Sequence, residues 1–142
     1  AVVRLFAAYG AVHAAPGNRA CHWVGIPMIY LGAAGALARA STPLMAAVVA
    51  AMMVAWLVLE WRLAILAILV SPVVLLGAMV LPLVPALLVF AAGFGISVAG
   101  HVVFEKGGPK SLREGAAGTF VAPLWLLNLA VGLVPESDPS LR

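Results

Sequence analysis

The chain alternates long apolar runs with short polar breaks, and this pattern predicts a polytopic membrane protein. A helix needs roughly 20 apolar residues to cross the hydrocarbon core of a bilayer. Runs close to this length recur along the whole chain. After a short N-terminal helix at 4–15, they predict about five membrane-spanning helices, over residues 19–38, 43–59, 63–81, 84–104 and 119–134.

Polar residues and prolines mark the ends of the predicted helices. Pro16-Gly17-Asn18 predicts a turn between the first two helices, and Asn18 is expected to cap the second. Glu60-Trp61-Arg62 interrupts the apolar sequence in the manner of a membrane boundary, with Glu60 expected to pair with Arg62 or to face water. Residues 63–104 carry no Asp, Glu, Lys or Arg, and Pro82 with Pro85 divides them into two helices.

Small residues are expected to allow close packing between the first and fourth spans, and to leave a groove there for an acyl chain. They are Gly32, Ala36, Ala92, Gly95, Ala99 and Gly100.

The composition excludes an ordinary soluble domain. Of the 142 residues 65% are hydrophobic and 9% are charged, with a mean hydropathy of +1.15, whereas soluble domains carry about 25% charged residues. The expected fold class is all-α: a membrane helical bundle forming a single integral membrane domain over residues 1–142. The one cysteine, Cys21, excludes an intrachain disulfide and a thiolate metal cluster. The sequence shows neither a basic stripe for nucleic acid nor a Gly-rich phosphate loop.

The predicted topology brings all three histidines to one side of the membrane. His13 and His22 precede or begin the first span, and His101 ends the fourth, so an even number of crossings separates them. Six of the eight basic residues fall on the same side. By the positive-inside rule the histidine side is therefore expected to be cytoplasmic.

This constellation predicts a metal site. Neutral imidazole is a common metal ligand, and three protein ligands with open positions are typical of a catalytic metal. Without thiolates, histidine and carboxylate ligation favours Fe(II), Zn or Mn. Tyr9 and His13, and likewise His101 and Glu105, are one helical turn apart, so Glu105 can join the metal or orient the imidazole.

At these residues the chain resembles the small membrane iron-dependent 2-hydroxy fatty acid dioxygenases of fatty acid α-oxidation. One family pattern, Tyr-x3-His-x2-Pro-x-Asn-x3-His-x2-Gly-x-Pro, is met by Tyr9, His13, Pro16, Asn18, His22, Gly25 and Pro27. A second, Gly-His-x2-Phe-Glu-Lys with a following Pro, is met by Gly100, His101, Phe104, Glu105, Lys106 and Pro109. The pair Ala122-Pro123 in the last span also fits, so the resemblance covers nearly the whole chain.

The resemblance implies Fe2+-dependent, O2-consuming shortening of a 2-hydroxy fatty acid by one carbon within a membrane. That membrane would be the cytoplasmic membrane of a bacterium or the endoplasmic reticulum of a eukaryote. Residue roles are hypotheses at this stage. His13, His22 and His101 hold the metal, and Glu105 is a further ligand, a partner of His101 or a base. Tyr9 and Asn18 donate hydrogen bonds to substrate or oxygen. Lys106 or Arg19 neutralises the substrate carboxylate.

Other interpretations remain open from the sequence. The histidines of a non-catalytic membrane protein could cap helices or bind lipid, and a zinc-dependent lipid hydrolase could use the same ligands. A proton relay expects ionisable residues at mid-bilayer, and residues 63–99 contain none. Four tryptophans are expected to anchor helices at the interface or to pack inside the bundle: Trp23, Trp56, Trp61 and Trp125.

Overall fold

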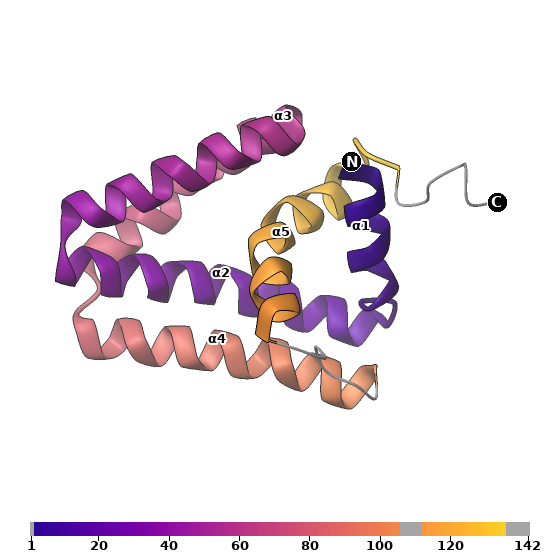
Figure 1. Cartoon of the computed structure of the whole chain (residues 1–142). Helices are drawn as coiled ribbons and strands as arrows, with labels where there is room; N and C mark the ends of the chain where they lie inside the picture. Colours follow the sequence, from indigo (N-terminus) through magenta and orange to yellow (C-terminus); the bar gives the residue numbers. More distant parts are fainter. Residues whose placement is uncertain (1, 106–111, 136–142) are drawn as a thin grey trace.

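A computed structural model describes residues 2–105 and 112–135, and this part of the chain is an all-α bundle (Figure 1). In chain order the helices are α1 (Val2–Ala11), α2 (Pro16–Ala40), α3 (Thr42–Val80), α4 (Leu83–Phe104) and α5 (Leu112–Val131). Among the described residues, α2, α3 and α4 are long and apolar enough to cross a membrane. The predicted fold class is confirmed.

The two central spans predicted from the sequence are the two halves of α3. The backbone of Glu60 leaves the helical region, with φ −156° and ψ 92°, and Figure 1 shows the chain reversing direction there. Glu60 accepts a hydrogen bond from Arg62 Nε at 2.8 Å, which confirms the predicted pairing. The polar pair therefore marks the bend, and the apolar helices on either side of it run in opposite directions.

The helix boundaries correct three expectations. α2 begins at Pro16, because proline suits the first helical position, so Asn18 lies inside the first turn and caps nothing. The predicted spans leave residues 39–42 between the first two, whereas in the structure only Ser41 separates α2 from α3. The Ser41 hydroxyl caps α3 by accepting from Leu44 N at 3.3 Å. The apolar part of α5, Ala117–Val131, is shorter than a span. It ends where Gly132 takes a positive φ of 65°.

The antiparallel pair α2 and α4 forms the centre of the bundle (Figure 1). Glycines set its register at seven-residue steps. A Cβ added at Gly25 would lie 2.7 Å from Gly93 O, and one added at Gly32 would lie 2.6 Å from Ala86 O. The two backbones are therefore in direct contact, as in membrane helix pairs with small residues at the interface.

The same register continues to the end of the bundle that carries the histidines. A Cβ added at Gly100 would lie 2.6 Å from Asn18 Oδ1. Of the small residues expected at this contact, Gly32 and Gly100 are used, whereas Gly95 faces open space and Ala92 and Ala99 are exposed. The predicted acyl groove between α2 and α4 is wrong, because the two helices close on each other there.

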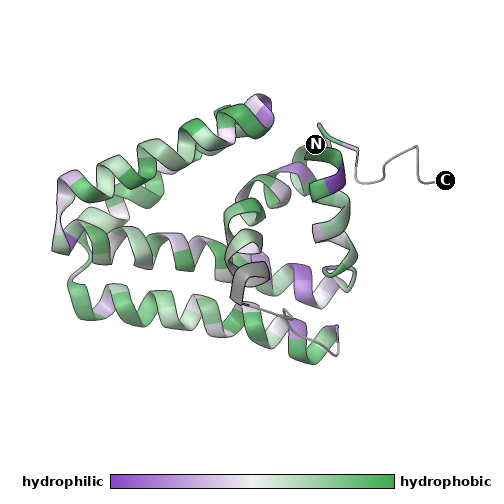
Figure 2. Ribbon diagram, viewed as in Figure 1, coloured by the Kyte–Doolittle hydropathy of each residue, from purple (hydrophilic) through white to green (hydrophobic). Residues whose placement is uncertain are grey.

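Two helices close the polar end of this pair. Side chains of α2 and α3 donate hydrogen bonds to main-chain carbonyls of α5. Tyr30 OH donates to Thr119 O and Trp56 Nε1 donates to Phe120 O, both at 3.0 Å. α1 packs on α5 through the buried Phe6. Figure 2 shows hydrophilic positions gathered at the bend of α3 and where α2 begins and α4 ends. The candidate site lies where α2 begins and α4 ends.

Candidate metal centre

The three histidines, far apart in sequence, converge at the end of the bundle. His13 lies in the turn between α1 and α2, His22 in the second turn of α2, and His101 in the last turn of α4. One ring nitrogen from each lies within 4.8 Å of the others. The ring centroids are 4.4, 4.6 and 4.9 Å apart. The prediction that topology brings the histidines together is confirmed.

Main-chain hydrogen bonds fix the tautomers of His13 and His22. His13 Nδ1 lies 2.6 Å from Tyr9 O, and His22 Nδ1 lies 3.0 Å from Asn18 O. A carbonyl oxygen only accepts, so each Nδ1 carries the proton and each neutral ring keeps its lone pair on Nε2. The two Nε2 atoms face each other at 3.1 Å. Two lone pairs at this distance repel unless a cation or a proton lies between them.

The geometry fits a metal ion better than a shared proton. Burial lowers the pKa of His13 below its ordinary value of 6.5, so this imidazole resists protonation. Metal–nitrogen bonds of about 2.1 Å at right or tetrahedral angles place two ligand nitrogens about 3.0–3.4 Å apart. The observed separation of 3.1 Å lies in this interval. The donor set is three imidazoles, which suits Fe(II), Zn or another borderline divalent ion.

Asn18 joins the third histidine to the rest of the centre. Its side chain is fully buried, and its Nδ2 lies 3.4 Å from His101 Nδ1 and 3.3 Å from Glu105 Oε1. Its Oδ1 has no hydrogen-bond partner among the described residues and packs over Gly100. The amide therefore bridges α2 and the end of α4, a role that its predicted place at a helix terminus did not suggest.

Glu105 holds the histidine-bearing turn against α4. Its Oε1 accepts from Ala15 N at 2.7 Å as well as from Asn18 Nδ2. The hydrogen bond from Ala15 N is the main reason why the pKa of Glu105 is lowered, so the carboxylate stays ionised. The group of nitrogens that can share a metal consists of the three imidazoles, and Glu105 lies outside it. The observed contacts of Glu105 are with the turn that carries His13 and with the Asn18 amide.

An aromatic wall closes the other side of His13. Tyr9 stacks on the imidazole, with ring centroids 4.0 Å apart and planes inclined by 17°. Trp125 of α5, fully buried, lies 5.0 Å from the Tyr9 ring and 5.3 Å from the His13 ring. Burial raises the pKa of Tyr9, so its phenol remains protonated. Sequence reasoning missed Trp125, because no local motif links it to the histidines.

Arg19, one of the two residues predicted to neutralise the substrate carboxylate, contacts the turn that carries His13. Arg19 Nε donates to His13 O at 2.7 Å, and its guanidinium lies 5.7 Å from the centre of the Trp125 ring. It therefore braces the turn that carries His13. Lys106, the other residue predicted to neutralise the substrate carboxylate, lies outside the described residues.

Comparison with known proteins identifies one family. Searches of curated proteins and of solved structures found no match. The profile of one protein family, described as 2-hydroxy-palmitic acid dioxygenase Mpo1-like, matches residues 1–134, which include all three histidines and Glu105. The chain therefore belongs to the Mpo1-like family.

Proposed function

We propose that the chain is an Fe(II)-dependent dioxygenase that shortens 2-hydroxy fatty acids by one carbon. The observation that carries the proposal is that the Nε2 atoms of His13 and His22 face each other at 3.1 Å, beside the imidazole of His101. The description of the family supplies the substrate class and the reaction type. The apolar bundle supports a substrate that resides in a membrane.

The metal contributes open coordination positions and the redox chemistry that O2 requires. The chain contributes a rigid set of three neutral nitrogen donors. The carbonyls of Tyr9 and Asn18 hold the rings of His13 and His22, while the Asn18 amide contacts His101. Because the rings of His13 and His22 each donate the other ring N–H to a carbonyl, these two donors need little rearrangement to bind an ion.

Atom balance defines the reaction to be tested. The bond between the carboxyl carbon and the hydroxyl-bearing carbon breaks. The carboxyl carbon leaves as CO2, and the hydroxyl-bearing carbon becomes the carboxyl group of the shortened acid. One O2 accepts the electrons from both carbons, and one water forms. The 2-hydroxyl group places a second oxygen next to the carboxylate, which gives the substrate two donor atoms for the site.

Four neighbouring residues receive supporting roles in this proposal. Glu105 and Asn18 fix the position of His101 and of the turn that carries His13. Tyr9 holds the His13 ring by stacking and keeps a phenol proton available for a hydrogen bond to substrate. Lys106, next to Glu105 in sequence, is the proposed partner of the substrate carboxylate, because the nearby Arg19 is already engaged with His13 O.

The site is proposed to face the cytoplasm. Six of the eight basic residues belong to the side of the predicted topology that carries the histidines, and such loops remain on the cytoplasmic side of membranes. A long acyl chain would stay in apolar surroundings while its polar head reaches this side.

The test is oxygen uptake by the purified protein reconstituted with Fe(II). With 2-hydroxypalmitic acid we expect equal amounts of O2 consumed, CO2 released and acid shortened by one carbon. Palmitic acid and 3-hydroxypalmitic acid serve as matched controls, because each lacks one of the two adjacent donor groups, and neither should be consumed. Bound zinc together with ester hydrolysis and no oxygen uptake would favour a lipid hydrolase and contradict the proposal.

A further inference from the structure

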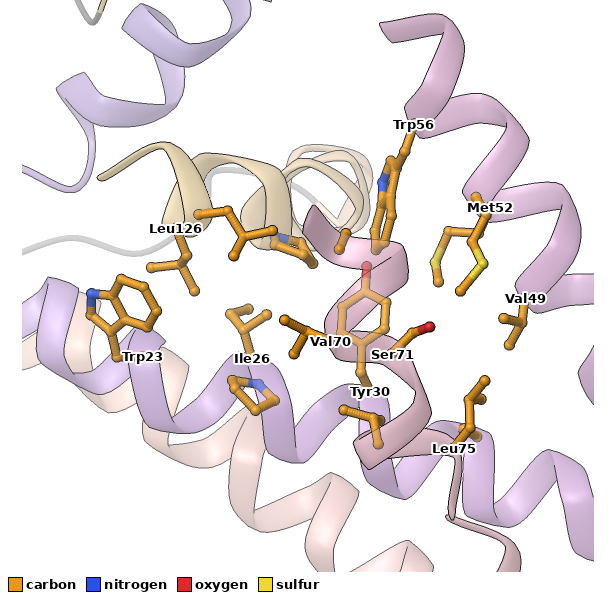
Figure 3. A pocket seen from close by; sticks show the side chains of 17 residues that line it. Trp23, Ile26, Tyr30, Val49, Met52, Trp56, Val70, Ser71, Leu75 and Leu126 are labelled. Carbon is orange, nitrogen blue, oxygen red and sulfur yellow. The ribbon is translucent and has the colours of Figure 1, made fainter. Parts of the chain in front are cut away.

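A separate apolar cavity of about 220 Å³ lies between α2, both halves of α3, and α5 (Figure 3). It is on a different side of α2 from the tight contact with α4. Figure 3 places Trp23 and Leu126 at one end of this cavity and Val49 and Leu75 at the other. The proposed function assigns no role to this cavity.

The walls offer a ligand almost no polar group. Two lining residues carry hydroxyls, but Tyr30 OH donates to Thr119 O at 3.0 Å and Ser71 Oγ donates to Ile68 O at 2.8 Å. Both hydroxyls are therefore satisfied within the protein. Among the other lining side chains only Trp23 and Trp56 carry an N–H, and that of Trp56 donates to Phe120 O at 3.0 Å. Met52 and Met53 add flexible thioethers that adapt to an apolar ligand.

The near end of the cavity is lined by residues of the same two helices, α2 and α5, that carry His22 and Trp125 of the histidine centre. On α2, Trp23 lines the cavity and directly follows His22. On α5, Leu126 lines the cavity and directly follows Trp125, which packs against the His13 ring. From Trp23 the cavity follows α2 as far as Ala34, a distance of about 16 Å at 1.5 Å per helical residue.

We infer that this cavity receives the acyl chain of the substrate, with the polar head at the histidines. The inference rests on the proposed function and adds the part of the protein that selects chain length. A ligand with an acidic head and a long alkyl tail matches a polar centre that shares two helices with an elongated apolar cavity. Val49 and Leu75 form the end of the cavity and set the longest chain accepted.

Substitutions at the far end test the role in chain length. Val49→Phe fills the cavity, and Val48→Phe is the matched control, because Val48 is 44% exposed and does not line it. We expect Val49→Phe to lower kcat/KM for 2-hydroxypalmitic acid at least tenfold while leaving a 2-hydroxy acid with a much shorter chain unchanged. Val49→Ala should shift the optimum to longer chains. An unchanged chain-length profile in both Val49 variants, with the metal retained, would overturn the inference.

A labelling experiment tests occupancy without requiring turnover. The intact protein is exposed to a 2-hydroxy fatty acid with a diazirine near the end of its chain, and labelled residues are mapped by mass spectrometry. We expect labels on Val49, Met52 and Met53, removed by excess unlabelled 2-hydroxypalmitic acid but not by phospholipid. Labels spread over exposed surfaces, or removed equally by phospholipid, would identify a lipid-filled crevice and overturn the inference. If no 2-hydroxy acid supports oxygen uptake, the proposed function fails, while this experiment still decides what the cavity binds.

Discussion

The Nε2 atoms of His13 and His22 lie 3.1 Å apart, although each imidazole donates its Nδ1 proton to a main-chain carbonyl. The arrangement places two lone pairs against each other in a buried site. A protein interior tolerates this only with a cation or a proton between the two nitrogens, and the lowered pKa of His13 disfavours the proton. The pair therefore explains why an apolar chain keeps three imidazoles at one end of its bundle, where His101 completes the donor set.

The glycine contact between α2 and α4 is predicted to control the distance between His22 and His101. In Gly93→Ala the new Cβ would lie 2.7 Å from Gly25 O and 2.8 Å from Ile29 N, so the helices must separate. We expect a loss of about 1–3 kcal/mol in stability and weaker metal binding. Gly95→Ala is the matched control on the same helix, since nothing lies within 4 Å of its added Cβ.

Thermal unfolding and metal titration of both variants provide the measurement. Equal behaviour of Gly93→Ala and Gly95→Ala would show that close helix contact does not determine the site.

The sequence predicted those features that depend on local patterns. The predicted span 84–104 corresponds to α4, Leu83–Phe104, because Pro82 begins it and an uncharged run fills it. The meeting of the histidines followed from an even number of crossings, which the reversal of α3 at Glu60 supplies. Both predictions depend only on the length of the apolar runs and on the polar residues and prolines that interrupt them.

Features that depend on distant partners could not be predicted. Asn18 resembles a helix cap in the sequence, and only the packing of α4 shows that its amide contacts His101 and Glu105. Trp125 resembles a membrane anchor, yet it packs against Tyr9 and His13 from the far end of the chain. In each case a side chain acquires its role from residues more than eighty positions away.

Glu105 is predicted to act by orientation rather than by binding the metal. Glu105→Gln keeps an oxygen that accepts from Ala15 N, whereas Glu105→Ala removes it. We expect the Ala variant to lose about 10–100-fold in metal affinity and the Gln variant to stay within a few-fold of the wild type. Metal titration decides between the roles: equally large losses in both variants would identify Glu105 as a ligand.

Tyr9 is predicted to serve the site with its ring and its hydroxyl separately. Tyr9→Phe keeps the stack on His13 and removes the phenol, so metal affinity should be retained while kcat falls. Tyr9→Leu also removes the stack, a loss of about 1 kcal/mol beyond area burial, and should weaken metal binding. Metal affinity and kcat are measured side by side for both variants. Unchanged kcat in Tyr9→Phe would restrict Tyr9 to positioning.

The metal-free protein is predicted to lose stability in mild acid. Burial lowers the pKa of His13 from 6.5, so the folded state favours the neutral ring more than the unfolded state does. The resulting stability is present above the unfolded pKa and is lost as the pH falls toward the lower folded value. We expect Tm to fall as the pH drops from about 6.5 towards the folded-state pKa of about 4, with a shallower slope in His13→Gln. Equal slopes would show that His13 does not contribute.

The most direct measurement of the central claim is the metal content of protein purified without oxygen and loaded with Fe(II). We predict one iron per chain in the wild type and in Ser97→Ala, a control at a buried polar residue on α4 whose hydroxyl donates to Gly93 O of the same helix. Each of His13→Ala, His22→Ala and His101→Ala should lose most of the iron while remaining folded. Full iron content in any of these histidine variants would contradict the three-imidazole centre.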